Sequence, residues 1–335
     1  MLELLKNLCS IDGTSGDEGA VRDFIISKID GFCDWRTDNL GNIIVFKKGK
    51  KSAPFKLMID AHTDEVGLIV TSITSTGFLK FKTVGGIETS SLMFRRVRLG
   101  NIYGVISGKP VHLVSGEEGK KLPKADTLYI DIGASSKEEA LKLVNPGDRA
   151  VVCGEFYTVG DKVISKAIDD RVGCAVLIDL IRSDSEYDFY GSFSAQEEIG
   201  LRGAKTAAFG IDPKYAIVLE GTTAADIAGV PDEKRVCKLG NGVAVSFMDG
   251  ATVYDRPLYN AALNSGISAQ PKCAVAGGND SGAVHLSREG VRTIALSVPC
   301  RYIHSESSVA DKRDIYALRE LAEYMKNYIL SGGAE

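Results

Sequence analysis

Histidine and carboxylate side chains follow four apolar segments of this 335-residue chain. The segments 55–61, 190–195, 215–219 and 293–298 are followed in turn by His62, by Glu197 and Glu198, by Glu220, and by His304. Short apolar segments of this kind predict buried strands, and the ligands of an α/β sheet bind at the carboxyl ends of its strands. The sequence therefore predicts that these five side chains converge at one edge of a sheet.

A pair of aspartates, Asp169 and Asp170, stands at the start of a helix predicted over 169–182. Taken alone, two acids at a helix start are explained by capping and by the helix dipole. A carboxylate has two oxygens, however, and can bridge two cations, which a histidine cannot do. Nitrogen and oxygen ligands without a thiolate suit zinc, cobalt or manganese in a two-metal site.

The adjacent glutamates Glu197 and Glu198 need a cation or a proton nearby if they lie at the mouth of a buried strand. Neighbouring side chains there point apart, so one can bind a metal while the other faces a water molecule. Two metals activate such a water for attack on a carbonyl, and a free carboxylate must carry its proton. Asp64 is placed to hold the second ring nitrogen of His62, as partners of metal-bound imidazoles do.

The composition is that of a soluble globular enzyme, with 44% apolar and 25% charged residues. A net charge of −4 gives no basic surface for nucleic acid or for a membrane. The seven cysteines form no Cys-x-x-Cys pair, the first residues lack a signal-type pattern, and no apolar run is long enough to span a bilayer. We expect a cytoplasmic protein that binds neither nucleic acid nor membranes.

Strand and helix patterns alternate at both ends of the chain, which predicts an α/β fold. Predicted helices cover 15–29, 200–209 and 311–330, and further strands cover 43–46, 243–248 and 272–275. From about residue 70 to about 161 the chain is instead β-branched, glycine-rich and turn-rich, apart from a short helical pattern at 136–143. This pattern predicts a small all-β domain inserted into the α/β domain.

The motifs together resemble the metallo-aminopeptidase family of glutamyl aminopeptidases and tetrahedral aminopeptidases, some members of which have been labelled cellulase or endoglucanase. The resemblance covers essentially the whole chain and rests on residues 60–67, 166–171, 196–204, 278–290 and 301–305. It implies a three-layer, mixed-sheet metallopeptidase domain at 1–69 and 162–335. It also implies a β-barrel-like dimerisation domain at 70–161, short peptide substrates, and assembly into a homododecamer of dimers.

The resemblance also implies a role for each site residue. His62 and His304 would bind one metal each, with Asp169 bridging them and Glu198 completing the His304 side. Glu197 would act as general base and then as general acid. The last ligand on the His62 side is often an aspartate in this family. Glu220 stands there in this chain, with Asp226 as the alternative.

The sequence leaves several points open. A related two-metal deacylase or carboxypeptidase would use the same ligands, whereas a glycoside hydrolase would need two carboxylates and no metal, which leaves both histidines without a role. A metal-binding protein without catalysis is a further alternative. We expect Arg171 to hold Asp169 or Asp170. Arg301 and Lys166 are close to the motifs in sequence, but this does not assign the preferred N-terminal residue.

Overall fold

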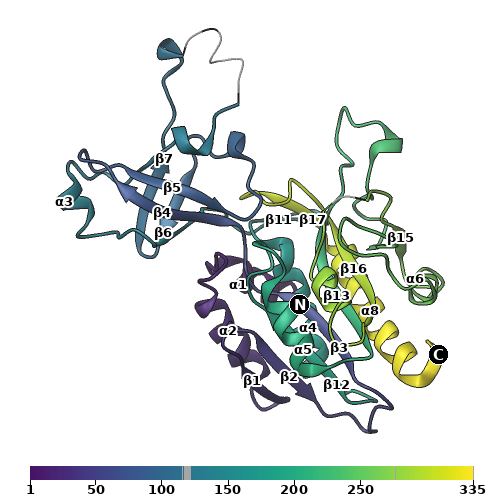
Figure 1. Cartoon of the computed structure of the whole chain (residues 1–335). Helices are drawn as coiled ribbons and strands as arrows, with labels where there is room; N and C mark the ends of the chain where they lie inside the picture. Colours follow the sequence, from purple (N-terminus) through teal and green to yellow (C-terminus); the bar gives the residue numbers. More distant parts are fainter. Residues whose placement is uncertain (115, 117–121, 276, 335) are drawn as a thin grey trace.

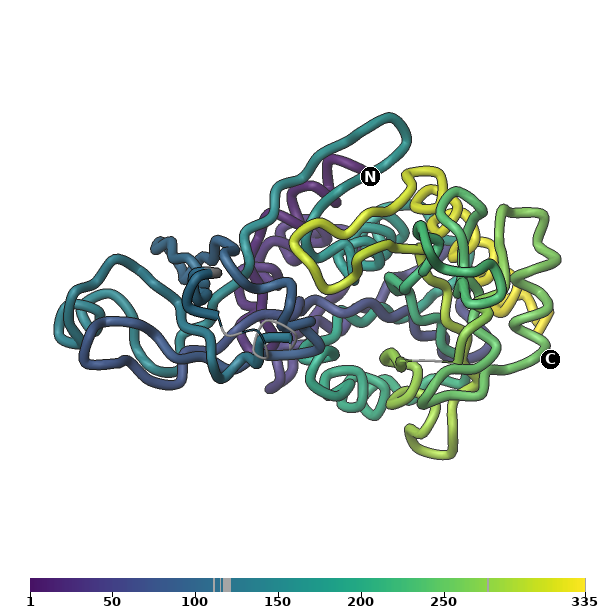
Figure 2. The backbone as a smooth tube through the Cα atoms, turned by 90° about the horizontal axis from the view of Figure 1, so that it is seen from above, coloured from purple at the N-terminus to yellow at the C-terminus, as the bar shows by residue number. Residues whose placement is uncertain are grey.

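The computed structural model describes residues 1–114, 116, 122–275 and 277–334. A large mixed sheet carries helices on its faces, and a small closed barrel stands apart from it (Figure 1). Seen from above, the barrel lies to one side of the α/β domain (Figure 2). The predicted α/β fold with an all-β insertion is confirmed. No helix within the described ranges is long and apolar enough to cross a membrane.

The large sheet places four parallel strands at its centre, β12, β3, β13 and β16, with β2 and β17 antiparallel beside them. Its full order is β1 (Asp34–Thr37), β2 (Ile43–Lys47), β12 (Phe189–Ser194), β3 (Leu57–His62), β13 (Tyr215–Thr223), β16 (Arg292–Arg301), β17 (Ser308–Asp311), β11 (Lys162–Ser165) and β10 (Tyr157–Val159). Two short strands, β14 (Val243–Val245) and β15 (Ala269–Pro271), extend it from β16.

Helices cover both faces of this sheet. On one face α4 (Ile168–Arg182) and α8 (Lys312–Tyr328) contact the strands, and α1 (Leu2–Ser10) and α2 (Gly19–Ile29) pack on α4. The other face carries α5 (Arg202–Ile211) and α7 (Ser281–Val284), while α6 (Arg256–Leu263) packs beside α8 and β14. Side chains alternate along a strand, so in β3 Leu57 and Ile59 join the α4 core and Met58 joins the α5 core.

Two predicted boundaries are wrong for local reasons. The first helical segment begins at Gly19 instead of residue 15, because residues 14–18 form a turn in which the Asp17 amide bonds to the Thr14 carbonyl. The strand predicted over 272–275 is displaced to β15. There Ala269–Pro271 make the ladder with β14, and the Cys273 amide bonds to Val236 instead.

The barrel closes in the order β4 (Gly67–Ile73), β5 (Leu79–Val84), β8 (Ile130–Asp131), β7 (Ile102–Ile106), β6 (Arg96–Leu99) and β9 (Arg149–Val152). It has its own apolar core, which includes Leu68, Leu79 and Val97. The inserted segment also contains one short helix, α3 (Lys137–Ala140), and three 3-10 turns, Thr89–Ser91, Val111–Leu113 and Ala125–Thr127. A further 3-10 turn, Asp232–Lys234, lies in the α/β domain. The β10 strand, within the range 70–161, pairs with β11 of the large sheet.

Candidate metal centre

His62 and Glu220 lie side by side because their strands are adjacent and parallel. Each stands two residues beyond the last pair of the β3–β13 ladder, Val218 with Asp60. The His62 Nε2 atom is 3.7 Å from Glu220 Oε2 and 3.4 Å from Asp169 Oδ1. Ligand atoms of these three residues lie within 4.8 Å of one another, close enough to hold one cation.

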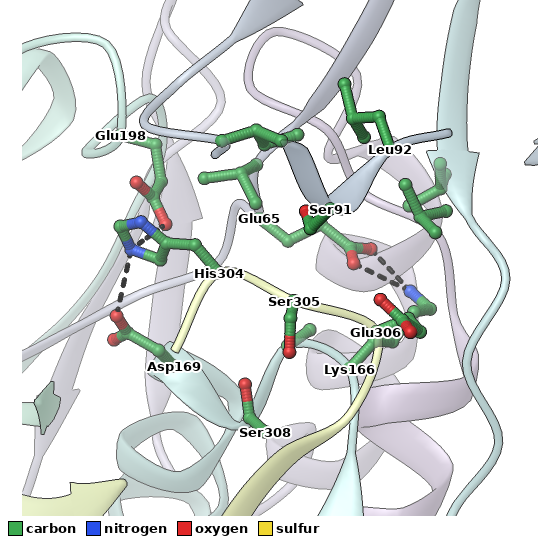
Figure 3. A pocket seen from close by; sticks show the side chains of 15 residues that line it. Glu65, Ser91, Leu92, Lys166, Asp169, Glu198, His304, Ser305, Glu306 and Ser308 are labelled. Carbon is green, nitrogen blue, oxygen red and sulfur yellow. Dashed lines mark hydrogen bonds and ion pairs between the residues drawn. The ribbon is translucent and has the colours of Figure 1, made fainter. Parts of the chain in front are cut away.

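Asp169 takes part in a second cluster through its other oxygen. Oδ2 is 3.4 Å from His304 Nε2, which lies 3.3 Å from Glu198 Oε1. Figure 3 shows the His304 imidazole between the carboxylates of Asp169 and Glu198. Asp169 can approach this closely because residue 221 is glycine, where an added Cβ would come within 2.9 Å of the Asp169 Cβ. One carboxylate therefore faces both histidines, one oxygen toward each.

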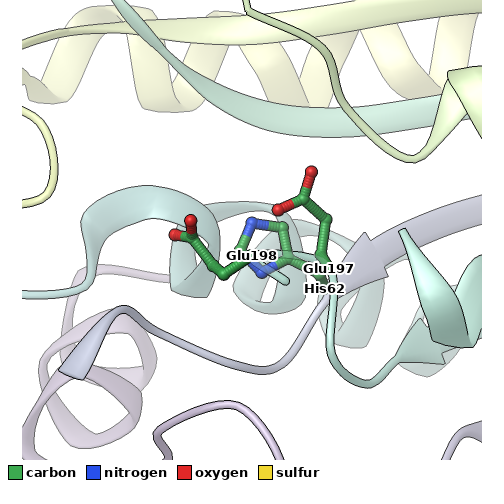
Figure 4. A group of neighbouring side chains, drawn as sticks. All are labelled: His62, Glu197 and Glu198. Atoms are coloured by element: carbon green, nitrogen blue, oxygen red, sulfur yellow. The ribbon is translucent and has the colours of Figure 1, made fainter. Parts of the chain in front are cut away.

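Glu197 and Glu198 are oriented by Asp64. Their backbone amides donate to Asp64 Oδ1 at 2.9 Å and Oδ2 at 3.1 Å, and the Ser15 hydroxyl donates to Oδ2 at 2.6 Å. Asp64 Oδ1 also lies 3.3 Å from His62 Nδ1, the nitrogen that faces away from Asp169. In Figure 4 the two glutamate carboxylates lie on opposite sides of His62 and point apart. Asp64 thus fixes three residues of the centre at once.

Asp226 and Arg171 do not have the contacts that the sequence analysis considered for them. Asp226 is ion-paired with Arg301 through both oxygens, at 2.7 and 2.8 Å, and it belongs to none of the candidate metal clusters among the described residues. The expectation that Arg171 holds Asp169 or Asp170 is wrong. The Arg171 guanidinium is fully buried and binds the carbonyls of Leu8 and Ile11 and the carboxylate of Glu65, because α1 packs directly against α4.

Several residues support the centre through hydrogen bonds and were not predicted from the sequence. Asp170 accepts the His62 backbone amide at 3.1 Å and the Gly173 amide at 2.9 Å. Lys166 donates to both oxygens of Glu65, at 2.6 and 2.8 Å, a buried pair visible in Figure 3. Asp170, Lys166 and Glu65 all lie within the sequence motifs. A residue's presence in a motif does not show whether it binds a metal or supports a residue that does.

Protons are held in this cluster by crowding and burial. Burial raises the pKa of Glu197 to about 8 and that of Glu198 to about 8. Burial disfavours the charged imidazole of His304, yet its contacts with Asp169 and Glu198 raise its pKa to about 9. Burial also opposes ionisation of Asp169, but the contacts with both histidines lower its pKa below the ordinary value.

The donor set fits two divalent cations. Metal ligands must be deprotonated, and a cation would relieve the crowding that raises the pKa of the carboxyl groups. Glu220 Oε1 is buried and has no hydrogen-bond partner within the described part of the chain, as expected for an atom that awaits a ligand. His62, Asp169 and Glu220 would hold one ion, and Asp169, Glu198 and His304 the other.

A cavity of about 530 Å³ opens beside these residues. Its lining includes all six candidate site residues, His62, Asp169, Glu197, Glu198, Glu220 and His304. The lining also includes Thr222, Thr223, Val236, Lys272 and Asn279. Its volume lies within the range of about 300–1,000 Å³ that is usual for small-molecule sites.

Known peptidases share this fold over nearly their whole length. A TET aminopeptidase from the marine sediment archaeon Thaumarchaeota archaeon SCGC AB-539-E09 matches with a TM-score of 0.92 at 33% identity, covering 97% of this chain and 95% of that one. The TET1 peptidase of Pyrococcus horikoshii, described as able to assemble into a tetrahedron or a large octahedral shell, matches at 0.84 and 35% identity, covering 97% and 98%. Lysyl aminopeptidase of Pyrococcus furiosus is 33% identical over 350 residues, 96% of this chain and 95% of that protein.

These likenesses, which include both the sheet domain and the barrel, define the chain as a peptide-bond hydrolase. The family model for M42 glutamyl aminopeptidase matches residues 41–321. The chain belongs to that family.

Proposed function

We propose that the chain is a two-metal aminopeptidase that releases N-terminal residues from short peptides. The observation that carries the proposal is the position of Asp169, whose two oxygens face His62 and His304. Zinc, cobalt or manganese suits these nitrogen and oxygen ligands. When bound, two such ions would polarise the scissile carbonyl and acidify a water molecule.

The residues of the chain would then divide the remaining work. Glu197 forms a third cluster with His62 and Glu198, whose ligand atoms also lie within 4.8 Å of one another. The two clusters assigned to the metal ions are complete without it. We assign it the proton transfer, first from the water to its own carboxylate and then to the leaving amine. Asp64 holds the backbone of Glu197 so that its side chain faces the cavity.

The inserted barrel is proposed to mediate self-association. It exposes large apolar side chains, among them Phe94, Tyr103 and Leu113, and exposed apolar groups of this kind mark interaction surfaces when they are contiguous. The P. horikoshii relative named above can assemble into a tetrahedron or a large octahedral shell. We expect a homododecamer of dimers in which residues 70–161 form the dimerisation domain. Light scattering on a sizing column measures the mass of the assembly and tests this expectation.

A panel of aminoacyl reporter substrates tests the proposed activity. The enzyme is freed of metal with a chelator and reloaded separately with Zn²⁺, Co²⁺ and Mn²⁺. We expect hydrolysis that is lost on chelation and restored by at least one ion. Activity on none of the reporters with any ion would contradict the proposal.

Blocked substrates separate the rival activities. A deacylase or carboxypeptidase would cleave N-acetylated peptides as fast as free ones, whereas the proposed aminopeptidase requires a free amine. Cleavage of a glucan that survives chelation would instead favour a glycoside hydrolase, which works with two carboxylates and no metal.

A further inference from the structure

The loop between β16 and β17, residues 302–307, carries His304 and contacts the inserted segment at two points. His304 Nδ1 lies 2.9 Å from the carbonyl oxygen of Gly86, and the Glu306 carboxylate pairs with the Arg95 guanidinium at 2.7 Å. Gly86 and Arg95 both belong to the stretch between the barrel strands β5 and β6. A candidate metal ligand of the α/β domain is therefore held by residues of the other domain.

The shape of this loop is set by contacts within it. Tyr302 and His304 have φ angles of 55° and 61°, a left-handed conformation that raises the energy of a residue other than glycine and persists only where other contacts hold it. The hydroxyls of Ser305 and Ser308 donate to the Tyr302 carbonyl at 2.6 and 3.1 Å. These hydrogen bonds fix the shape of the loop, whereas its contacts with the inserted segment fix its position over the metal centre.

A narrow cavity of about 30 Å³ lies between the loop and the inserted segment. Its lining includes Ile87, Ser91 and Leu92 of the inserted segment and His304, Ser305 and Glu306 of the loop. In Figure 3 the loop runs along this cavity, with His304 at the metal centre and Glu306 at the opposite end. The space has room for about two water molecules. Because side chains do not fill it, close packing alone does not hold the loop here, and the polar contacts at its two ends gain importance.

The inserted segment can support the loop because it is itself attached to the α/β domain by an ion pair. Arg98 on β6 donates to both carboxylate oxygens of Asp12, at 2.6 Å each. Asp12 also lies 3.4 Å from the ammonium group of Lys166, which is paired with the buried Glu65. A bidentate pair of this kind fixes orientation as well as distance. Arg95, three residues before Arg98, is therefore held in place relative to the metal centre.

We propose that Arg95 is a positioning residue for the metal ion held by His304. Through Glu306 it keeps the loop in place, so that the imidazole is already beside its carboxylate partners before the ion arrives. The proposal rests on the two-metal function proposed above. A ligand that is held in its bound position loses less conformational freedom when the ion binds, so the affinity is higher. His62 is positioned by the central sheet instead, and its ion should not depend on Arg95.

Isothermal titration of the metal-free enzyme with Zn²⁺ or Co²⁺ tests this proposal, because it gives a separate Kd for each ion. The ion held by His304 is identified as the one that His304→Ala fails to bind. Arg95→Met and Glu306→Gln remove the same ion pair from its two sides. Each should raise the Kd of this ion about 3- to 10-fold, the range for immobilising one side chain on binding. The Kd of the other ion should not change.

Further variants separate a positioning role from a general structural one. Arg95→Lys keeps the charge and should retain most of the wild-type affinity. Arg95→Glu combined with Glu306→Arg should restore affinity that either charge reversal alone removes. Lys51→Met is the matched control, because Lys51 pairs with Glu186 at the same 2.7 Å, beyond the end of β12 that is remote from the metal centre. It should leave both Kd values unchanged. Circular dichroism and urea unfolding of the metal-free variants establish that each one is folded.

Two results would overturn the proposal. The first is an unchanged Kd for the His304 ion in folded Arg95→Met and Glu306→Gln. The second is an equal loss of affinity for both ions, which would make the ion pair a general support of the fold. A wild-type enzyme that binds fewer than two ions per chain would instead refute the proposed two-metal function, whatever the variants do.

Discussion

The two histidines of the proposed metal centre are held in different ways. The His62 side chain is 1% exposed and ends a central strand, whereas that of His304 is 29% exposed and lies in the loop between β16 and β17. Asp64 and Asp170 support His62 through its ring and its backbone. His304 Nδ1 instead lies 2.9 Å from the carbonyl of Gly86, in the segment that follows the barrel strand β5.

This difference suggests a division of the site into a rigid half and an adjustable half. Ligands that are already positioned lose little conformational freedom on binding, so they hold an ion more tightly than ligands on an exposed loop. We therefore expect the ion at His62 to bind more tightly and the ion at His304 to exchange. Because Gly86 belongs to the inserted segment, the barrel influences the second half of the site.

The largest effect is expected from the carboxylate that joins the two halves. Asp169→Asn keeps the shape of the side chain but removes its charge, so turnover should fall to that of a blank and no more than one ion per chain should remain. Metal content and reporter hydrolysis measure both. Asp226→Asn is the control, since Asp226 is ion-paired outside the clusters. Two ions and full turnover in Asp169→Asn would end the proposed bridging role.

Chelator titration tests the difference between the halves directly. As the chelator concentration rises, one ion should leave before the other. The two affinities should differ by about 10- to 100-fold, the range that outer partners of metal ligands contribute. His304→Ala should lack the weaker ion and keep the tighter one, as measured by isothermal titration. If His304→Ala instead loses the tighter ion, the assignment of the halves is reversed.

A buried and a more exposed ion pair near the site are expected to differ in their contribution to the free energy of unfolding. Lys166 with Glu65 is buried at 5% and 4% exposure, whereas Arg95 with Glu306, beside the His304 loop, is 50% and 13% exposed. Lys166→Met should lower the free energy of unfolding by about 3–5 kcal/mol, because it leaves a buried carboxylate poorly paired. Arg95→Met should lower it by less than about 1 kcal/mol. Equal losses in urea unfolding would contradict this reading.

The pH dependence of the metal-free protein is expected to be a smaller effect. In the fold the pKa of Glu197 and of Glu198 is raised from 4.5 to about 8, and that of His304 from 6.5 to about 9. The folded state therefore holds protons that the unfolded state releases as the pH rises. This stabilisation is complete below about pH 4.5 and is lost as the pH rises through 8 to 9.

Melting temperatures of chelated and metal-loaded protein between pH 5 and pH 9 measure this effect. The chelated protein should lose stability as the pH rises, while the loaded protein should show little of that loss, because its ligands are already deprotonated. A chelated protein that becomes more stable toward pH 9 would contradict the protonation scheme.

The sequence named residues of both halves of the site, with Asp226 as an alternative to Glu220 in the rigid half, but it gave a reason for the local geometry of the rigid half alone. His62 and Glu220 are placed by strands whose apolar composition is readable, so their proximity follows from sheet architecture. The backbone conformations of Gln196 and His304, with φ of 60° and 61°, left no sequence signal. Neither did the contact of His304 with Gly86, since it joins residues from two domains that no local pattern relates.

Lys272 shows a second limit of sequence reasoning. The sequence drew attention to Arg301 and Lys166 because they stand next to the motifs, yet both are engaged by carboxylates in the fold. Lys272 lies outside the motifs, a few residues before the one at 278–290, and the pairing of β14 and β15 brings it into the wall of the cavity. The sequence identifies cationic side chains near the motifs, but only the tertiary structure shows which of them are paired with a carboxylate.

The metal content and turnover of Glu197→Gln, measured on the same sample, test the proposed two-metal mechanism most directly. Glutamine keeps the size of the side chain but cannot accept the proton. We expect two ions per chain, as in the wild type, and a loss of turnover of about 100- to 10,000-fold. A variant that retains two ions and wild-type turnover would remove Glu197 from proton transfer, and one that loses an ion would make it a ligand.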